Sequence, residues 1–296
     1  MRERAGRKGL SLSAALLLAI LLTAGLLLAG CKNVRSPEVV KIGLIAPFEG
    51  PSRPLGYGVL DAVKLRINQW NESDAPFKVE LVALNDDSNP ELAAQLPAQL
   101  AQDPDIRVIL GPPQGHTAAA AQMALARTGI PTILLAPVKG VVGVDILPFA
   151  GIERDYRQVF HLESGETPAA WTPPITRPVI WFGDPLILAE TYTTQPGMIV
   201  AVGPVAEEEV LKAWAPGLTD HLPWAAPAPI NLPEDFSSEY EAVAGRPPTR
   251  AAALAYAATE YAIAIIAATP GRIPDASQLQ AIPTPPITLM NEHLMQ

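Results

Sequence analysis

The chain has 296 residues and a net charge of -9, with 49% hydrophobic and 17% charged residues. This composition excludes a disordered polymer and predicts buried cores, and the length favours two domains. The first thirty residues carry a net positive charge, so the rest of the chain is strongly acidic. Nucleic acid is therefore excluded as a partner.

Residues 1–30 have the order of an export signal. Basic residues occur from Arg2 to Lys8, and no charged residue follows from Gly9 to Gly30. A basic start, an apolar stretch and small residues predict a signal peptide that is excluded from the fold. The alternative is an uncleaved signal anchor, because an uncharged stretch of about 20 residues could also span a bilayer.

Cys31 is the only cysteine, so it cannot form an internal disulfide. The four residues Leu28-Ala29-Gly30-Cys31 resemble the lipobox of bacterial lipoproteins. That resemblance implies cleavage before Cys31, acylation of its sulfur and anchoring at the outer face of the membrane, with residues 31–37 as a tether.

The next hundred residues alternate between strand and helix patterns. Short β-branched or apolar runs predict strands at 39–46, 77–84, 106–110 and 130–136, and helical spacing predicts helices around 60–70, 91–101 and 117–127. This alternation predicts an α/β fold with a doubly wound parallel sheet. Ligands bind beyond the carboxyl ends of such strands, which selects the loops at 47–56, 85–90, 111–117 and 137–140.

The remainder is richer in proline and less regular. Strands are predicted at 179–182 and 198–202 with a short helix at 185–192 between them. Two helices are predicted at 234–244 and 250–268, the second with Thr249 as its N-cap. The tail from Gly271 has no assignable element.

Several segments in order resemble one family. They are Ile42-Gly43-Leu44-Ile45-Ala46-Pro47-Phe48-Glu49-Gly50-Pro51, Leu55-Gly56, Asn85-Asp86-Asp87-Ser88-Asn89-Pro90, Val108-Ile109-Leu110-Gly111-Pro112 and Gly245-Arg246-Pro247-Pro248. Together they resemble the leucine/branched-chain amino-acid binding proteins, which are substrate-binding subunits of ABC importers with the type I periplasmic-binding fold.

The resemblance implies two doubly wound α/β lobes with a ligand between them. Lobe one would be 38–137 plus 233–270, and lobe two 138–232 plus 271–296. Members of this family usually have a larger second lobe, so lobe two is expected to be reduced.

The loop at 111–117 is the first candidate ligand site. It joins a strand to an alanine-rich helix, whose first N–H groups favour a carboxylate or phosphate. The resemblance implies that Gln114, Gly115, His116 and Thr117 contact the carboxylate of a solute. The alternative is structural, with Gly115 serving the turn and Thr117 capping the helix. The loop lacks the phosphate-binding pattern of nucleotide-binding proteins.

Further candidates follow from the family's other ligand loops. Ser52, Arg53 and Leu55 would line the site from lobe one, and Lys139 would add a positive charge. Trp181 and Asp184 are the candidates from lobe two. The structural alternative for Lys139 is a solvated surface position. The alternative for Trp181 is a position in the core.

The sequence contains no recognisable catalytic constellation. Asp86 and Asp87 are adjacent, so on an extended chain they point to opposite faces and are better explained by a polar turn. His116, His161, His221 and His293 have no metal-ligand spacing, and neither a metal nor another cofactor is expected. A hydrolase that uses Asp86 and His116 would need an isolated carboxyl group with a perturbed pKa in a cleft.

The sequence therefore predicts a non-enzymatic, exported and lipid-anchored solute-binding protein of an ABC importer. Its solute would be small and polar, such as an amino acid or another carboxylate. Its partners would be a permease and the membrane, through Cys31. The alternative is a degenerate scaffold that acts as a sensor or interaction lipoprotein without transport.

Overall fold

The computed structural model describes residues 37–136 and 231–271, short strands between these ranges, and parts of the tail that follows. Cys31, Lys139 and Asp184, and the helix expected at 185–192, lie outside the described residues.

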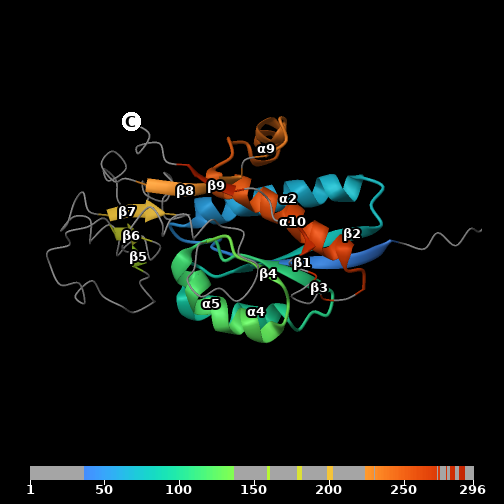
Figure 1. Ribbon diagram of the computed structural model, residues 1–296, viewed down its shortest axis with the longest axis horizontal. Coiled ribbons are helices and arrows are strands. Elements are labelled where there is room, and N and C mark those ends of the chain that lie inside the picture. Colours follow the sequence, from blue (N-terminus) through green and yellow to red (C-terminus); the bar gives the residue numbers. More distant parts are fainter. Residues whose placement is uncertain are drawn as a thin grey trace, which may run out of the picture. The chain divides into compact units, whose positions relative to one another are not determined.

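The first sheet has four strands in the order β2-β1-β3-β4 (Figure 1). They are β1 (Glu38–Ala46), β2 (Phe77–Asn85), β3 (Ile106–Leu110) and β4 (Thr132–Ile133). β3 pairs in parallel with both β1 and β4, which confirms the parallel sheet. β4 is shorter than predicted, since Pro131 has no N–H to donate, although its carbonyl accepts from the Ile109 N–H at 2.9 Å.

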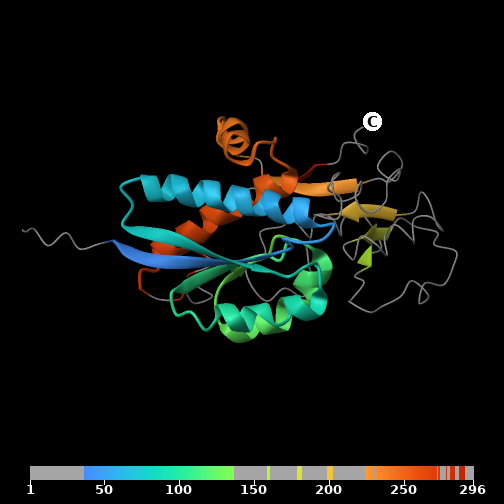
Figure 2. The same cartoon turned by 180° about the vertical axis from the view of Figure 1, so that it is seen from behind.

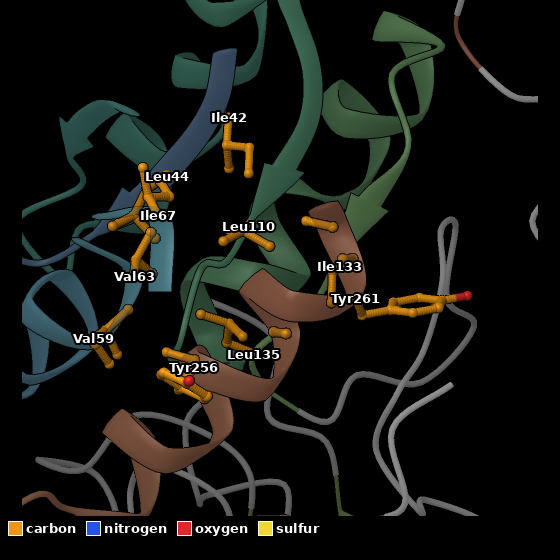
Figure 3. Packing of buried hydrophobic residues seen from close by; sticks show 14 of the residues in the cluster. Ile42, Leu44, Val59, Val63, Ile67, Leu110, Ile133, Leu135, Tyr256 and Tyr261 are labelled. Atoms are coloured by element: carbon orange, nitrogen blue, oxygen red, sulfur yellow. The ribbon is translucent and has the colours of Figure 1, made fainter. Parts of the chain in front are cut away.

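Two long helices cover one face of this sheet, α2 (Arg53–Glu72) and α10 (Arg250–Ala268), as Figures 1 and 2 show. Figure 3 shows side chains of both helices, such as Val59 and Tyr256, packed with Leu44 and Leu110 of the sheet. α10 is long and apolar enough to cross a membrane, but 78% of its apolar window is buried. It is therefore a core helix here.

Three helices pack against the opposite face: α3 (Pro90–Ala93), α4 (Leu96–Leu100) and α5 (Gly115–Thr128). A single helix was predicted over 91–101, and that prediction is wrong. Pro97 lies in the first turn of α4, where its missing N–H is tolerated. A continuous helix would need that N–H for its backbone ladder, so the chain breaks into two short helices.

The late helical pair agrees with the prediction. α9 (Phe236–Ala244) precedes α10, and the Thr249 hydroxyl caps α10 by accepting from the Ala252 N–H at 3.2 Å. The Tyr240 hydroxyl donates to the Gly58 carbonyl at 3.2 Å, which ties α9 to α2.

A second sheet has the strand order β5-β6-β7-β8-β9. It consists of β5 (Val159–Phe160), β6 (Val179–Trp181), β7 (Ile199–Val202), β8 (Trp224–Pro229) and β9 (Ile287–Met290). The first four are parallel, and β9 is antiparallel to β8. β6 and β7 were predicted, whereas β5, β8 and β9 were not. The boundaries of the two lobes stay a prediction.

Candidate functional site

The loops that follow β1, β2 and β3 come together at one edge of the first sheet. These strands are neighbours in the order β2-β1-β3, so their carboxyl ends lie side by side. The three loops supply Ser52, Ser88 and Gln114. The strand pattern of the sequence predicts all three loops but does not single out Ser88.

A chain of hydrogen bonds joins the three loops. The Ser88 hydroxyl donates to Gln114 Oε1 at 2.8 Å, and Gln114 Nε2 donates to the Ser52 hydroxyl at 3.1 Å. His116 Nε2 lies 3.1 Å from the Ser88 carbonyl oxygen. Ser52 is fully buried, and Gln114 and His116 are each 3% exposed. We call Ser52, Ser88, Gln114 and His116 the loop network.

Gly111 lets the loop after β3 cross the end of β1. Its φ is +86°, and a Cβ atom there would lie 2.3 Å from the Ile45 carbonyl oxygen. A side chain at this position would therefore combine a disfavoured backbone conformation with a clash. Gly111 thus helps to bring Gln114 within reach of Ser52.

The start of α5 differs from the structural alternative in which Thr117 caps the helix. The helix begins at Gly115, and Gln114 occupies the N-cap position without a side-chain cap hydrogen bond. Thr117 lies in the first turn and its hydroxyl donates back to the Gln114 carbonyl at 3.2 Å, so the expectation that Thr117 caps the helix is wrong. Because the Gln114 side chain is directed to Ser52 and Ser88, it accepts no hydrogen bond from the first N–H groups of α5.

Asp86 begins the turn after β2 and is fully buried. Its Oδ1 accepts from the Ser88 N–H at 3.0 Å, whereas Oδ2 has no hydrogen-bond partner among the described residues. Burial raises the pKa of Asp86 to about 6, and the Ser88 N–H and the nearby Thr117 hydroxyl lower it in part. This carboxyl group therefore changes its charge near pH 6.

The rest of this segment is the predicted polar turn. Asp87 is exposed, so the two adjacent carboxyl groups lie in different environments. Asp87 and Ser88 have φ of 51° and 54°, a conformation that Asp tolerates better than most residues. The Asn89 side chain caps α3 by accepting from the Glu91 and Leu92 N–H groups.

The three candidates of the first loop lie at the start of α2, which begins earlier than predicted. Ser52 occupies its N-cap position and joins the loop network. Arg53 is exposed, with its guanidinium 5.2 Å from the centre of the Tyr57 ring. Leu55 is 3% exposed and packs in the core between α2 and the sheet. The structure therefore separates these neighbours into network, surface and core positions.

Of the other candidates, Lys139 and Asp184 lie outside the described residues. Trp181 is the last residue of β6, where its backbone lies opposite Ala201. Within the part of the chain that the structure describes, no group of three His, Cys, Asp or Glu residues could hold a metal ion. The described site is thus a set of hydroxyl, amide and imidazole groups with one buried carboxyl group.

Comparison with protein families identifies residues 39–179 as similar to the family described as periplasmic binding protein. This match begins at β1 and extends to the start of β6, so it includes all three loops of the site. The resemblance drawn from the sequence is confirmed. No curated protein sequence matches the chain.

Solved structures give the same fold. A possible leucine/isoleucine/valine-binding protein from Rhodopirellula baltica has a TM-score of 0.59 at 12% identity, covering 85% of this chain and 87% of its own. The branched-chain amino acid transporter substrate binding protein LivJ from Streptococcus pneumoniae, in complex with isoleucine, has a TM-score of 0.52 at 14% identity, covering 82% and 87%. An R. palustris solute binding protein in complex with 4-hydroxybenzoate has a TM-score of 0.53 at 15% identity, covering 83% and 84%. The chain therefore has the type I periplasmic-binding fold.

Proposed function

We propose that the protein is an extracytoplasmic solute-binding protein of an ABC importer, which binds a small carboxylate-bearing solute at the start of α5. The solute would be an amino acid or another small carboxylic acid. Two of the similar structures hold isoleucine and 4-hydroxybenzoate, and both molecules carry a carboxylate.

The observation that carries this proposal is the loop network at the beginning of α5. The first turn of a helix offers N–H groups and the positive end of the helix dipole, which favour an anion. The Gln114 side chain is held by Ser52 and Ser88 and accepts none of these N–H groups. A carboxylate could therefore accept from them without breaking a side-chain cap.

The hydroxyl and amide groups at this edge also fit a binding site better than a catalytic one. Ser52, Ser88 and Gln114 are neutral donors and acceptors, which can orient a solute but supply no activated nucleophile. Differential affinity for an open and a closed state would then report occupancy to a permease.

Cys31 would hold the protein at the membrane. The segment Leu28-Ala29-Gly30-Cys31 supports cleavage before Cys31 and acylation of its sulfur. A lipid anchor of this kind keeps a soluble body at the membrane surface, next to the permease that it serves.

The second candidate function is a sensor or docking lipoprotein that has kept the fold without transporting. The burial of Gln114, His116 and Thr117 favours this alternative, because the protein's own side chains already occupy the edge of the sheet.

Thermal unfolding in the presence of small solutes distinguishes the two functions. The purified protein would be tested with the common amino acids, benzoate and 4-hydroxybenzoate. A solute at 100 times its dissociation constant should stabilise the folded state by about 2.7 kcal/mol. Saturable stabilisation by at least one carboxylate supports the transport function, and no stabilisation by any of them supports the sensor.

A further inference from the structure

Asp86 is the least satisfied polar group next to the loop network. It has no exposed surface, and its Oδ2 makes no hydrogen bond among the described residues. An unpaired buried carboxylate is costly. Such a group therefore either takes up a proton or gains a partner when conditions change.

The backbone holds this carboxyl group in place. The Asp86 N–H donates to the Ala46 carbonyl at 3.2 Å, and the Asp86 carbonyl accepts from the Asn89 N–H at 2.8 Å. These bonds anchor the turn to the end of β1 and to the start of α3. The side chain consequently stays at the sheet edge, beside the first turn of α5.

Two contacts connect Asp86 to the site. Ser88, whose N–H donates to Asp86 Oδ1, also donates its hydroxyl to Gln114. The Thr117 hydroxyl lies close enough to lower the pKa of Asp86, although it now donates to the Gln114 carbonyl. Thr117 thus belongs both to the surroundings of Asp86 and to the first turn of α5, where we assign the solute.

Among the described residues, few titratable groups face Asp86 from the elements packed around it. Asp87 of the same turn raises the pKa of Asp86 by charge repulsion. His116 comes from α5 and contacts the Ser88 carbonyl. The loop before α2 contributes the neutral Ser52, while its charged residues Glu49 and Arg53 are exposed. His116 is therefore the group that an experiment must distinguish from Asp86.

We propose that Asp86 is a positioning residue of the solute site, which takes up one proton when a carboxylate binds at the start of α5. This inference rests on the proposed function. An ionised Asp86 competes with the Gln114 carbonyl for the Thr117 hydrogen. A protonated Asp86 instead donates to the Thr117 oxygen, which leaves the Thr117 hydrogen free to donate to the solute carboxylate.

The proton comes from the solvent on binding and returns to it on release, so no covalent bond changes. The bound carboxylate disfavours a second negative charge beside it and therefore stabilises the protonated form of Asp86. By linkage, binding must then become tighter as the pH falls. Solute affinity should be on the order of fivefold or more higher at pH 6 than at pH 8.

Isothermal titration calorimetry with benzoate and with isoleucine tests this inference. Each titration is run at pH 7 in two buffers with different ionisation enthalpies, which gives the number of protons taken up. The wild-type protein should take up about 0.4 to 0.9 proton per bound molecule, because about a tenth of Asp86 is already protonated at pH 7. The Asp86→Asn variant, which resembles the protonated form, should bind with no proton uptake, and His116→Asn should keep the uptake.

Proton uptake that persists in Asp86→Asn, or that is lost in His116→Asn, overturns the inference and leaves the proposed function standing. If neither probe binds, the carboxylate that stabilises the protein in thermal unfolding takes their place. If none of the tested carboxylates binds to the wild-type protein, the proposed function is overturned, and the inference with it.

The Thr117 variants keep the inference testable if Asp86→Asn does not fold. Thr117→Ser retains the hydroxyl and should retain the pH dependence of affinity. Thr117→Val removes the hydroxyl and should weaken binding with a flatter pH profile. Equal pH profiles for Thr117→Val and the wild-type protein would exclude the Thr117 hydroxyl as the link between Asp86 and the solute, which would overturn the inference.

Discussion

The Ser88 hydroxyl donates to the Gln114 side chain at 2.8 Å, which joins the turn after β2 to the residue before α5. These residues are 26 positions apart and come from loops at the ends of β2 and β3, with β1 between these strands in the sheet. This bond and the one from Gln114 to Ser52 span all three strand ends and define the candidate site.

Replacing Gln114 with alanine should destabilise the protein by about 1–3 kcal/mol, because Ser52 is buried and would lose a partner. Urea unfolding measures this loss. Gln99→Ala, at an exposed position of α4, is the matched control and should change stability by less than about 0.5 kcal/mol. Similar losses for both variants would show that the loop network does not stabilise this edge of the sheet.

Asp86→Asn should make the folded protein more stable at pH 7.5. The folded-state pKa of Asp86 is raised from 3.8 to about 6, so the stability associated with the protonated group is present below pH 4 and is lost as the pH rises through 6. A pKa shift of this size lowers the free energy of unfolding by roughly 3 kcal/mol once Asp86 is ionised.

Denaturation of wild type and Asp86→Asn from pH 4 to 8 measures that difference. The stability gained by Asp86→Asn should grow as the pH rises and level off above pH 7. A constant difference across this range would contradict the raised pKa.

Two glycines of α2 should respond in opposite ways to substitution by alanine. A Cβ at Gly56 would lie 1.6 Å from the Pro47 carbonyl oxygen, so Gly56→Ala should cost about 2 kcal/mol or more. A Cβ at Gly58 would meet its nearest atom at 3.6 Å, and alanine is the better helix former there, so Gly58→Ala should stabilise by about 0.5–1 kcal/mol. Thermal unfolding of the two variants tests the close approach of α2 to β1.

Tyr240→Phe should cost about 1 kcal/mol, because the buried hydroxyl donates to the Gly58 carbonyl between α9 and α2. Tyr57→Phe serves as the control, since Tyr57 is 38% exposed. Unfolding by urea compares the two. No loss in Tyr240→Phe would mean that this hydroxyl does not help to hold α9 to α2, which would leave packing and the hydrogen bond from Gln69 Nε2 to Glu239 Oε2.

Cys31→Ser should release the protein from membranes if Cys31 is the lipid anchor. Fractionation of cells that produce the wild-type or Cys31→Ser protein measures the membrane-bound share. Retention of Cys31→Ser in the membrane fraction would instead favour the uncleaved signal anchor.

The sequence predicted the first sheet well, because β1 and β3 are nearly continuous apolar runs. Their burial within a parallel sheet leaves that pattern uninterrupted. The two late helices were predicted as well, from the capping residue Thr249 and the helical spacing that follows it. Local patterns were sufficient to predict these elements, because the apolar run or the capping residue lies within the element or directly before it.

Other elements depend on distant contacts that no local pattern contains. β8 contains Pro227 and Pro229, which pair with Leu289 and Ile287 of β9, and prolines within a strand argue against assigning one. α2 begins at Arg53 although Pro54, Gly56 and Gly58 are typical of a loop. Pro54 is compatible with the first turn of a helix, and Gly56 is required by the close approach of Pro47.

The candidate site was predicted at the level of loops rather than side chains. The rule for parallel sheets selected the loops containing Ser52, Ser88 and Gln114. The hydrogen bonds among them depend on the register between β1 and β3, which the sequence does not reveal. A hydroxyl residue in the loop at the carboxyl end of a strand was the one signal that could have singled out Ser88.

The most direct test of the central claim is nuclear magnetic resonance of the backbone amides at the start of α5. A solute that stabilises the protein would be added to a ¹⁵N-labelled sample. We predict that the Gly115, His116 and Thr117 amide signals shift in a saturable manner, because these N–H groups donate to the carboxylate. Unchanged signals at these three residues, with the solute bound elsewhere, would contradict the account.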